Sequence, residues 1–171
     1  MKALSAALVS LLLLSACGAS YLRTDDIYEE QAGFAIDEEA EIRDTTDNRK
    51  VMDVLITYRN AMVRKDVGAL RRLISERYYD NGGTTDTTRD DYAAEALPEI
   101  FELLAQRADQ IKYDVVVKNL EVKEGVAFVD YEYQYAYQYS VGDQPTWDAG
   151  LDVNRLELES EDGEWKIVSG L

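Results

Sequence analysis

The sequence predicts an α+β fold in which three helices pack on one face of a curved, mainly antiparallel sheet of four strands. Apolar residues recur at helical spacing between residues 49 and 104, which indicates amphipathic helices. After Asp109 they alternate with polar residues at a period of two, which is typical of half-buried strands. Helices that precede the strands, rather than alternating with them, favour an α+β order over a parallel α/β sheet.

The first two helices follow from their apolar spacing and their capping residues. The first is predicted from about residue 49 by Val51, Leu55, Tyr58 and Met62. Asp47 precedes it and is the expected N-cap. Asp66 is the expected cap of a short second helix over residues 67–74.

The third helix contains a proline, which leaves two interpretations open. Thr88 and Asp91 have the spacing of a capping box. A buried stripe comes next, made of Leu97, Ile100, Phe101 and Leu104. Pro98 interrupts the pattern, so either the helix kinks there or a new helix begins with Pro98 in its first turn.

Four strands are separated by short turns. They are expected over residues 111–121, 126–141, 147–159 and 164–170. The turns contain Gly125, Gly142 and Gly163, and glycine is the usual residue where a turn requires a positive φ. The apolar phase of the third strand changes after Val153, which predicts a bulge near Asn154 and Arg155.

The second strand carries an unusual row of tyrosines on one face. The row consists of Tyr131, Tyr133, Tyr135, Tyr137 and Tyr139. Asp130 and Glu132 lie on the opposite face, and their burial without partners would be costly, so the tyrosine face is predicted to point toward the helices. The favoured interpretation of the row is core or interface packing, and the alternative is contact with a flat or glycan-like ligand.

The N-terminus has the order of a secretory signal, with Lys2 followed by an apolar stretch too short to span a bilayer. Leu14-Ser15-Ala16-Cys17 resembles the lipobox of bacterial lipoproteins, which implies cleavage after residue 16 and attachment to the lipid bilayer through acylated Cys17. The alternative is an ordinary signal cleaved after Ala19, which would discard Cys17. Gly18 follows the cysteine in place of the Asp typical of inner-membrane retention, so we expect an outer-membrane anchor facing the periplasm.

Residues 17–47 are expected to form an acidic tether, and residues 48–171 the folded domain. Removal of residues 1–16, with Lys2 as their only charged residue, changes the formal charge from −16 to −17. Such a charge disfavours nucleic acid as a partner. The chain has no histidine and only one cysteine, which excludes histidine-based catalysis and domain disulfides. No cofactor or metal site is expected.

The domain resembles the NTF2-like superfamily, also called SnoaL-like or ketosteroid-isomerase-like, in its pattern of residues. Tyr58, Lys65-Asp66 and Tyr78-Tyr79 are similar to the region of that superfamily's first two helices and the turn between them, and residues 163–170 are similar to its closing strand. The resemblance implies a cone-shaped fold with a pocket between the sheet and the helices. It also implies that a homodimer can form through the outer sheet face.

We therefore favour a non-catalytic periplasmic domain that binds a small ligand or an envelope protein. The alternative is an isomerase or dehydratase that uses a pocket carboxylate, such as Asp130 or Asp152, with a tyrosine donor. The candidate ligand-binding residues are Tyr131, Tyr133, Tyr135, Trp147, Asp152 and Arg155. A structural ion pair with a nearby carboxylate is the favoured interpretation of Arg155.

Overall fold

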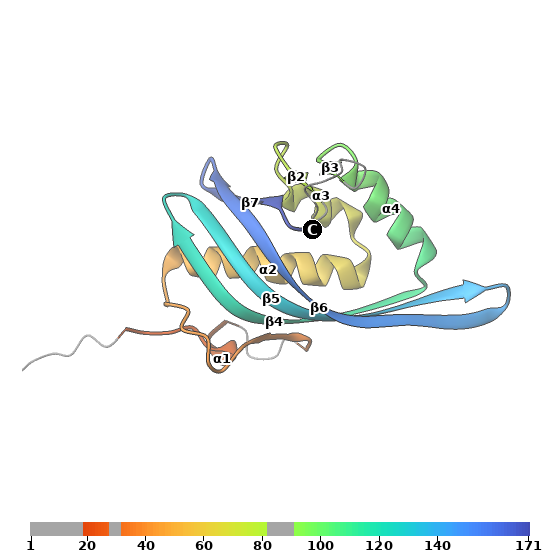
Figure 1. Ribbon diagram of the computed structural model, residues 1–171, viewed down its shortest axis with the longest axis horizontal. Helices are drawn as coiled ribbons and strands as arrows, with labels where there is room; N and C mark the ends of the chain where they lie inside the picture. The colour runs from red at the N-terminus through yellow and green to blue at the C-terminus, as the bar shows by residue number, and fades with distance from the viewer. Residues whose placement is uncertain (1–18, 28–31, 82–90) are drawn as a thin grey trace, which may run out of the picture.

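The computed structural model describes residues 19–27, 32–81 and 91–171 (Figure 1). Its elements are α1 Thr24–Ile27, β1 Phe34–Ile36, α2 Thr46–Arg64, α3 Val67–Leu73, β2 Tyr79–Asp80, β3 Tyr92–Ala93, α4 Leu97–Arg107, β4 Gln110–Lys123, β5 Val126–Val141, β6 Gln144–Glu161 and β7 Glu164–Ser169. One curved sheet has the strand order β1-β4-β5-β6-β7, with α2, α3 and α4 on its concave side. The α+β class is confirmed. The sheet has five strands rather than four, and α1 and the β2–β3 hairpin are additional elements.

The helix starts depend on which side chain reaches the free backbone N–H groups. Thr45, with an extended backbone, caps α2, because its hydroxyl accepts a hydrogen bond from the Asn48 N–H at 3.1 Å. Asp47 lies inside the first turn, so its expected role as N-cap was wrong. Asp66 caps α3 as predicted and accepts from the Ala69 N–H at 2.9 Å.

The open question about Pro98 is decided in favour of a new helix. Helix α4 begins at Leu97 with Pro98 in its first turn, where a missing N–H costs no helical hydrogen bond. Tyr92 and Ala93 form β3, so the helix does not extend back through them. Thr88, the predicted capping residue, lies outside the described residues.

The strands match their predicted positions, but the bulge predicted near Asn154 and Arg155 does not interrupt the pairing of β5 with β6. Strands β5 and β6 pair in unbroken register from Val126 opposite Glu159 to Val141 opposite Gln144. The register shifts instead between Glu157 and Leu158, where β6 meets β7. The apparent phase change arose because two apolar side chains, Leu151 and Val153, lie on the outer face and are 62% and 69% exposed.

The tyrosine face of β5 points toward the helices, as predicted. Tyr131 is only 1% exposed, and Ala127 and Val129 on the same face are also buried. Tyr58 of α2 makes an edge-to-face contact with Tyr113 of β4, which stacks on Tyr133 of β5. The helix-facing side of the sheet is therefore partly an aromatic core.

The described part of the predicted tether is folded onto the domain. Strand β1 pairs with β4 in parallel, with Phe34 opposite Val115. Leu22 and Ile42 are both buried in the main core. The interpretation of residues 19–27 and 32–47 as free coil was wrong, because a few buried apolar side chains suffice to dock a segment whose acidic residues stay largely exposed.

The β5–β6 hairpin extends beyond the rest of the sheet. The pairing of β4 with β5 ends at Gln110 opposite Gln138, so the last residues of β5 pair with β6 alone. Figure 1 shows this arm projecting past the C-terminal end of α4. Among the described residues, none of the helices is both long and apolar enough to cross a membrane.

Candidate functional site

A continuous row of stacked phenols runs from the core to the base of the hairpin arm. The ring centroids of Tyr113 and Tyr133 are 5.3 Å apart, those of Tyr133 and Tyr135 are 6.1 Å apart, and those of Tyr135 and Tyr137 are 5.0 Å apart. The planes of each pair are within 30° of parallel, a stacked arrangement that is favourable for aromatic rings. Because side chains at alternate positions of a strand share one face, all five tyrosines of β5 lie on the concave side.

The neighbouring strand places small and acidic residues beside these phenols. Directly opposite Tyr133, Tyr135 and Tyr137 of β5 are Asp152, Gly150 and Asp148 of β6. Cross-strand partners project from the same face of a sheet, so both carboxylates share the concave face with the phenols. The concave face of the hairpin therefore combines aromatic surface with negative charge.

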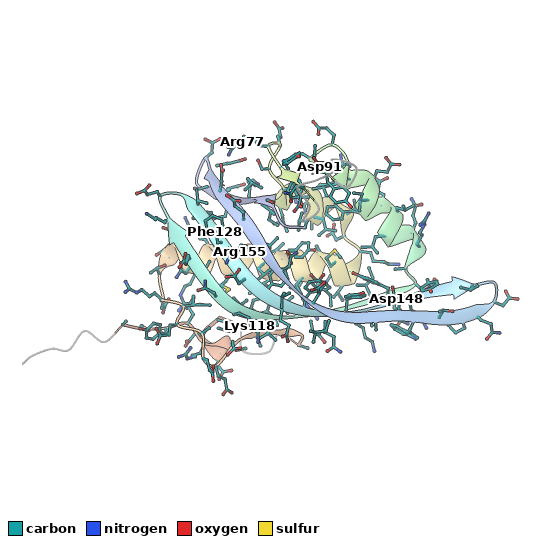
Figure 2. The ribbon with its side chains drawn as sticks, in the orientation of Figure 1. Arg77, Asp91, Lys118, Phe128, Asp148 and Arg155 are labelled. Atoms are coloured by element: carbon teal, nitrogen blue, oxygen red, sulfur yellow. The ribbon has the colours of Figure 1, made fainter. Side chains whose placement is uncertain are left out.

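A cleft of about 470 Å³ opens where this face passes the end of α4. Its lining comes from α4 and the segment after it, from β5 and from β6: Leu104, Arg107, Ala108, Tyr137, Tyr139, Ser140 and Asp148. The Asp109 N–H donates to the Gln138 carbonyl at 2.6 Å and fixes the end of the helix over the strand. Figure 2 shows Asp148 at the base of the arm, near the C-terminal end of α4. The volume is in the range of small-molecule sites.

Two phenols of the row, Tyr133 and Tyr137, are poor bases and remain neutral at physiological pH. Burial, followed by the neighbouring phenols and Asp148, raises the pKa of Tyr137 to about 12. Burial, followed by the Asp152 carboxylate, raises the pKa of Tyr133. These hydroxyls can donate hydrogen bonds to a ligand, but they do not supply a phenolate.

The structure separates the six predicted ligand-binding residues. Tyr133, Tyr135 and Asp152 share the concave face, near the cleft but outside its lining. Tyr131 is buried in the core, where its hydroxyl accepts from the Asn154 amide at 3.4 Å. Trp147 and Arg155 belong to the outer face of β6, so the six residues do not form a single concave site.

Arg155 forms the structural ion pair that the sequence favoured. Its Nε lies 2.5 Å from Asp130 Oδ1, and its Nη2 lies 3.0 Å from Asp130 Oδ2. This bidentate contact holds the pKa of Asp130 below its ordinary value. Figure 2 places Arg155 on the middle of β6, away from Asp148 and the arm. Asp130 is therefore not a base directed into the tyrosine row.

The carboxylate–phenol contacts that involve the β2–β3 hairpin lie elsewhere. The Tyr78 hydroxyl donates to Asp80 Oδ2 at 3.3 Å, and the Gly170 N–H donates to the same oxygen at 2.6 Å. Asp80 thus holds the residues after β7 and does not line the cleft at α4. The Tyr79 hydroxyl donates to Asp91 between the two strands of the hairpin. Within residues 19–27, 32–81 and 91–171, no three acidic or cysteine side chains converge to hold a metal ion.

Sequence reasoning missed much of the cleft for two different reasons. Asp148 could have been found, because a tight turn at Gly142 and Asp143 sets a register that places it opposite Tyr137. The contribution of Leu104, Arg107 and Ala108 depends on how α4 lies over the arm. No local pattern contains that information.

Comparison with solved structures supports an NTF2-like fold. A proposed dehydratase of the NTF2-like family from Streptomyces avermitilis superposes with a TM-score of 0.61 at 15% identity, covering 73% of this chain and 94% of that one. A proposed scytalone dehydratase from Novosphingobium aromaticivorans superposes with a TM-score of 0.59 at 13% identity, covering 72% and 80%. A conserved protein from Planctomyces limnophilus gives a TM-score of 0.61 at 17% identity, covering 72% and 92%. No protein-family model and no curated protein matches the sequence.

Proposed function

Since the chain has an NTF2-like fold, we propose that it is a lipid-anchored envelope protein that binds a small ligand without transforming it. The cleft between α4 and the tyrosine row is the binding site in this proposal. The observation that carries it is the continuation of the stacked phenols, through Tyr135 and Tyr137, from the core to an open cleft of ligand size. Aromatic walls with a few polar groups are typical of small-molecule sites.

The binding proposal is tested with benzyl alcohol, an uncharged and water-soluble aromatic probe. Titration into the full chain, labelled with ¹³C on its tyrosine rings, is expected to shift a subset of ring signals saturably. Tyr137→Ala removes one wall of the cleft and is expected to abolish the saturable shifts. Tyr92→Ala is the matched control, because Tyr92 is an exposed tyrosine of β3 outside the cleft lining. Shifts that survive Tyr137→Ala would contradict this site.

The lipid anchor is proposed at Cys17, outside the described residues, in the outer membrane facing the periplasm. Several acyl chains would make attachment effectively permanent. Cys17→Ser is expected to move the protein to the soluble fraction, and the wild type is expected to stay with the membranes through a high-salt wash. Cys17 is the one cysteine of the sequence, so the substitution removes no disulfide within the chain. Membrane association of Cys17→Ser after the same wash would contradict the anchor.

An enzyme of dehydratase or isomerase type is the second class, because two of the structurally similar proteins are proposed dehydratases. Asp152 is the candidate base on the tyrosine face, but its Oδ1 accepts from the neighbouring Val153 N–H, and the chain has no histidine. A general base contributes about 10²- to 10⁴-fold in rate. Turnover of an unsaturated ketone that falls by this factor in Asp152→Asn would favour the enzyme. A pure binder is expected to show no turnover in either form.

The outer face of the sheet supports a further role in self-association. Leu151 and Val153 are exposed there beside Trp147, in a chain that is otherwise strongly acidic. A twofold dimer would cover this apolar strip on both copies. Sedimentation velocity is expected to show a dimer that Val153→Lys converts to a monomer. A wild-type chain that stays monomeric at high concentration would leave this face to a different envelope protein.

A further inference from the structure

The cleft at α4 contains two opposite charges that do not neutralise each other. Arg107 extends from the last turn of α4, and Asp148 lies on β6 across the cleft. Both are exposed, and within the part of the chain that the structure describes neither forms an ion pair. Elsewhere in the molecule, Arg155 is matched by Asp130 and Lys118 by Asp37.

The remaining lining of the cleft is neutral, and much of it is apolar. Leu104 and Ala108 form the side contributed by the end of α4, and the Tyr137 ring forms the side contributed by β5. Tyr137 is protonated at neutral pH and therefore adds no charge. Ser140 donates its hydroxyl hydrogen to Asp109 Oδ2 at 2.8 Å, so a second carboxylate lies at the rim, outside the lining. The lining of the cleft therefore offers one cationic group, one anionic group and an apolar wall.

The pair of charges disfavours two simpler classes of ligand. A purely anionic ligand would meet Arg107 but would also meet Asp148 and the field of a chain with a formal charge of −16. A purely cationic ligand would meet Asp148 but would be repelled by Arg107. A ligand with both charges satisfies both groups, and its apolar part can pack on the neutral wall.

Building on the binding function proposed above, we propose that the cleft takes a small zwitterion, in particular an α-amino acid with an aromatic or apolar side chain. Its carboxylate pairs with Arg107, its ammonium group pairs with Asp148, and its side chain packs against Leu104 and Tyr137. Arg107 would act as a guanidinium fork for the carboxylate, which is the geometry this side chain favours. The phenols of the row then contribute surface for the side chain and no chemistry.

The test compares three ligands that share a phenyl ring and a short chain but differ in which charged groups they carry. L-phenylalanine carries both groups, 2-phenylethylamine lacks the carboxylate, and 3-phenylpropionate lacks the ammonium group. Titrations of the full chain, followed calorimetrically and by tyrosine ring NMR, are expected to give L-phenylalanine an affinity at least tenfold higher than either analogue. A charge-assisted contact in a wet cleft is worth about this factor.

Two charge variants then assign each contact. Arg107→Gln is expected to weaken L-phenylalanine about tenfold and to leave 2-phenylethylamine unweakened. Asp148→Asn is expected to weaken 2-phenylethylamine and to leave 3-phenylpropionate unweakened. Arg64→Gln is a matched control, because Arg64 occupies the last turn of α2 as Arg107 does in α4. Asp143→Asn in the hairpin turn is the control for Asp148.

The outcomes separate this inference from the function on which it rests. Equal affinity for the three ligands, or indifference to Arg107→Gln, would overturn the zwitterion, and saturable binding of benzyl alcohol would then still support the cleft. If neither benzyl alcohol nor any of the three ligands binds, both proposals are wrong. Arg64→Gln could also weaken L-phenylalanine as much as Arg107→Gln does. The effect of Arg107 would then be a general electrostatic one, and the assignment of the ligand carboxylate to Arg107 would be overturned.

Discussion

The Tyr135 phenol lies across Gly150 of the neighbouring strand. A β-carbon at Gly150 would come within 2.7 Å of the Tyr135 hydroxyl oxygen and within 2.9 Å of its ring carbons. The glycine thus leaves the space in which the ring can lie over β6 and stack on Tyr137 at 5.0 Å. The aromatic row that leads to the cleft depends on the absence of one side chain.

Gly150→Ala is accordingly expected to displace the Tyr135 ring. The stacking with Tyr133 and Tyr137 would be lost in part, which corresponds to about 1 kcal/mol of unfolding free energy. The tyrosine signal in near-ultraviolet circular dichroism and the affinity for benzyl alcohol are both expected to fall. Ala149→Val is the control, because it enlarges the adjacent residue on the outer face. Unchanged ring signals in Gly150→Ala would contradict the close approach.

The packed N-terminal segment predicts a stability effect that a free tether would not show. Ile42 is buried in the main core, and Glu41 beside it is exposed. Ile42→Ala is expected to lower the free energy of unfolding by about 2–5 kcal/mol because it leaves a cavity. Glu41→Ala is the matched control and is expected to change little. Urea unfolding of both variants measures the difference, and equal stabilities would mean that the segment is not docked in solution.

The buried phenols predict a loss of stability in alkali. Burial raises the pKa of Tyr131 to about 12, although hydrogen bonds with Tyr113 and Asn154 lower it in part. Because this folded pKa is above the unfolded value of about 10, its contribution is complete below pH 10 and is lost as the pH rises toward 12. Urea unfolding is expected to show a fall in stability between about pH 9 and about pH 11.5.

Tyr131→Phe tests the origin of this alkaline transition. The variant has one phenol fewer to ionise, so its stability is expected to fall less steeply above about pH 10 than that of the wild type. At pH 7 it is expected to lose about 1 kcal/mol with the hydroxyl hydrogen bonds. Tyr92→Phe, at an exposed tyrosine, is expected to leave the slope unchanged. Equal slopes in all three proteins would show that Tyr131 does not contribute.

The Asp130–Arg155 pair predicts the opposite dependence in acid. The Arg155 guanidinium holds the pKa of Asp130 below its ordinary value, so the contribution is present above the unfolded pKa of about 3.9 and is lost as the pH falls through the folded pKa. Arg155→Gln is expected to flatten the decrease in melting temperature between about pH 5 and about pH 2.5. Arg64→Gln should leave that decrease as in the wild type. A variant curve parallel to the wild-type curve would contradict the role of the pair.

Local pattern was sufficient for much of the fold. The period of two predicted the bounds of β5 correctly, because alternation along a half-buried strand is visible within a few residues. The same alternation, with the cost of burying Asp130 and Glu132, predicted correctly which face of β5 meets the helices. Asp66 was identified as a cap because its partner, the Ala69 N–H, is only three residues away. Composition alone showed that histidine and domain disulfides take no part in the chemistry.

Contacts between distant segments determined the rest. The parallel pairing of Phe34 with Val115 recruits an acidic segment whose composition is that of a tether, because the edge of β4 supplies the hydrogen bonds and the apolar surface. The bulge was misplaced because Leu151 and Val153 lie on an exposed face, and a sequence does not state whether an apolar residue is covered. Arg107 and Asp148 face one cleft only because α4 ends above the β5–β6 arm, which extends beyond the end of β4. That geometry is a property of the packed chain.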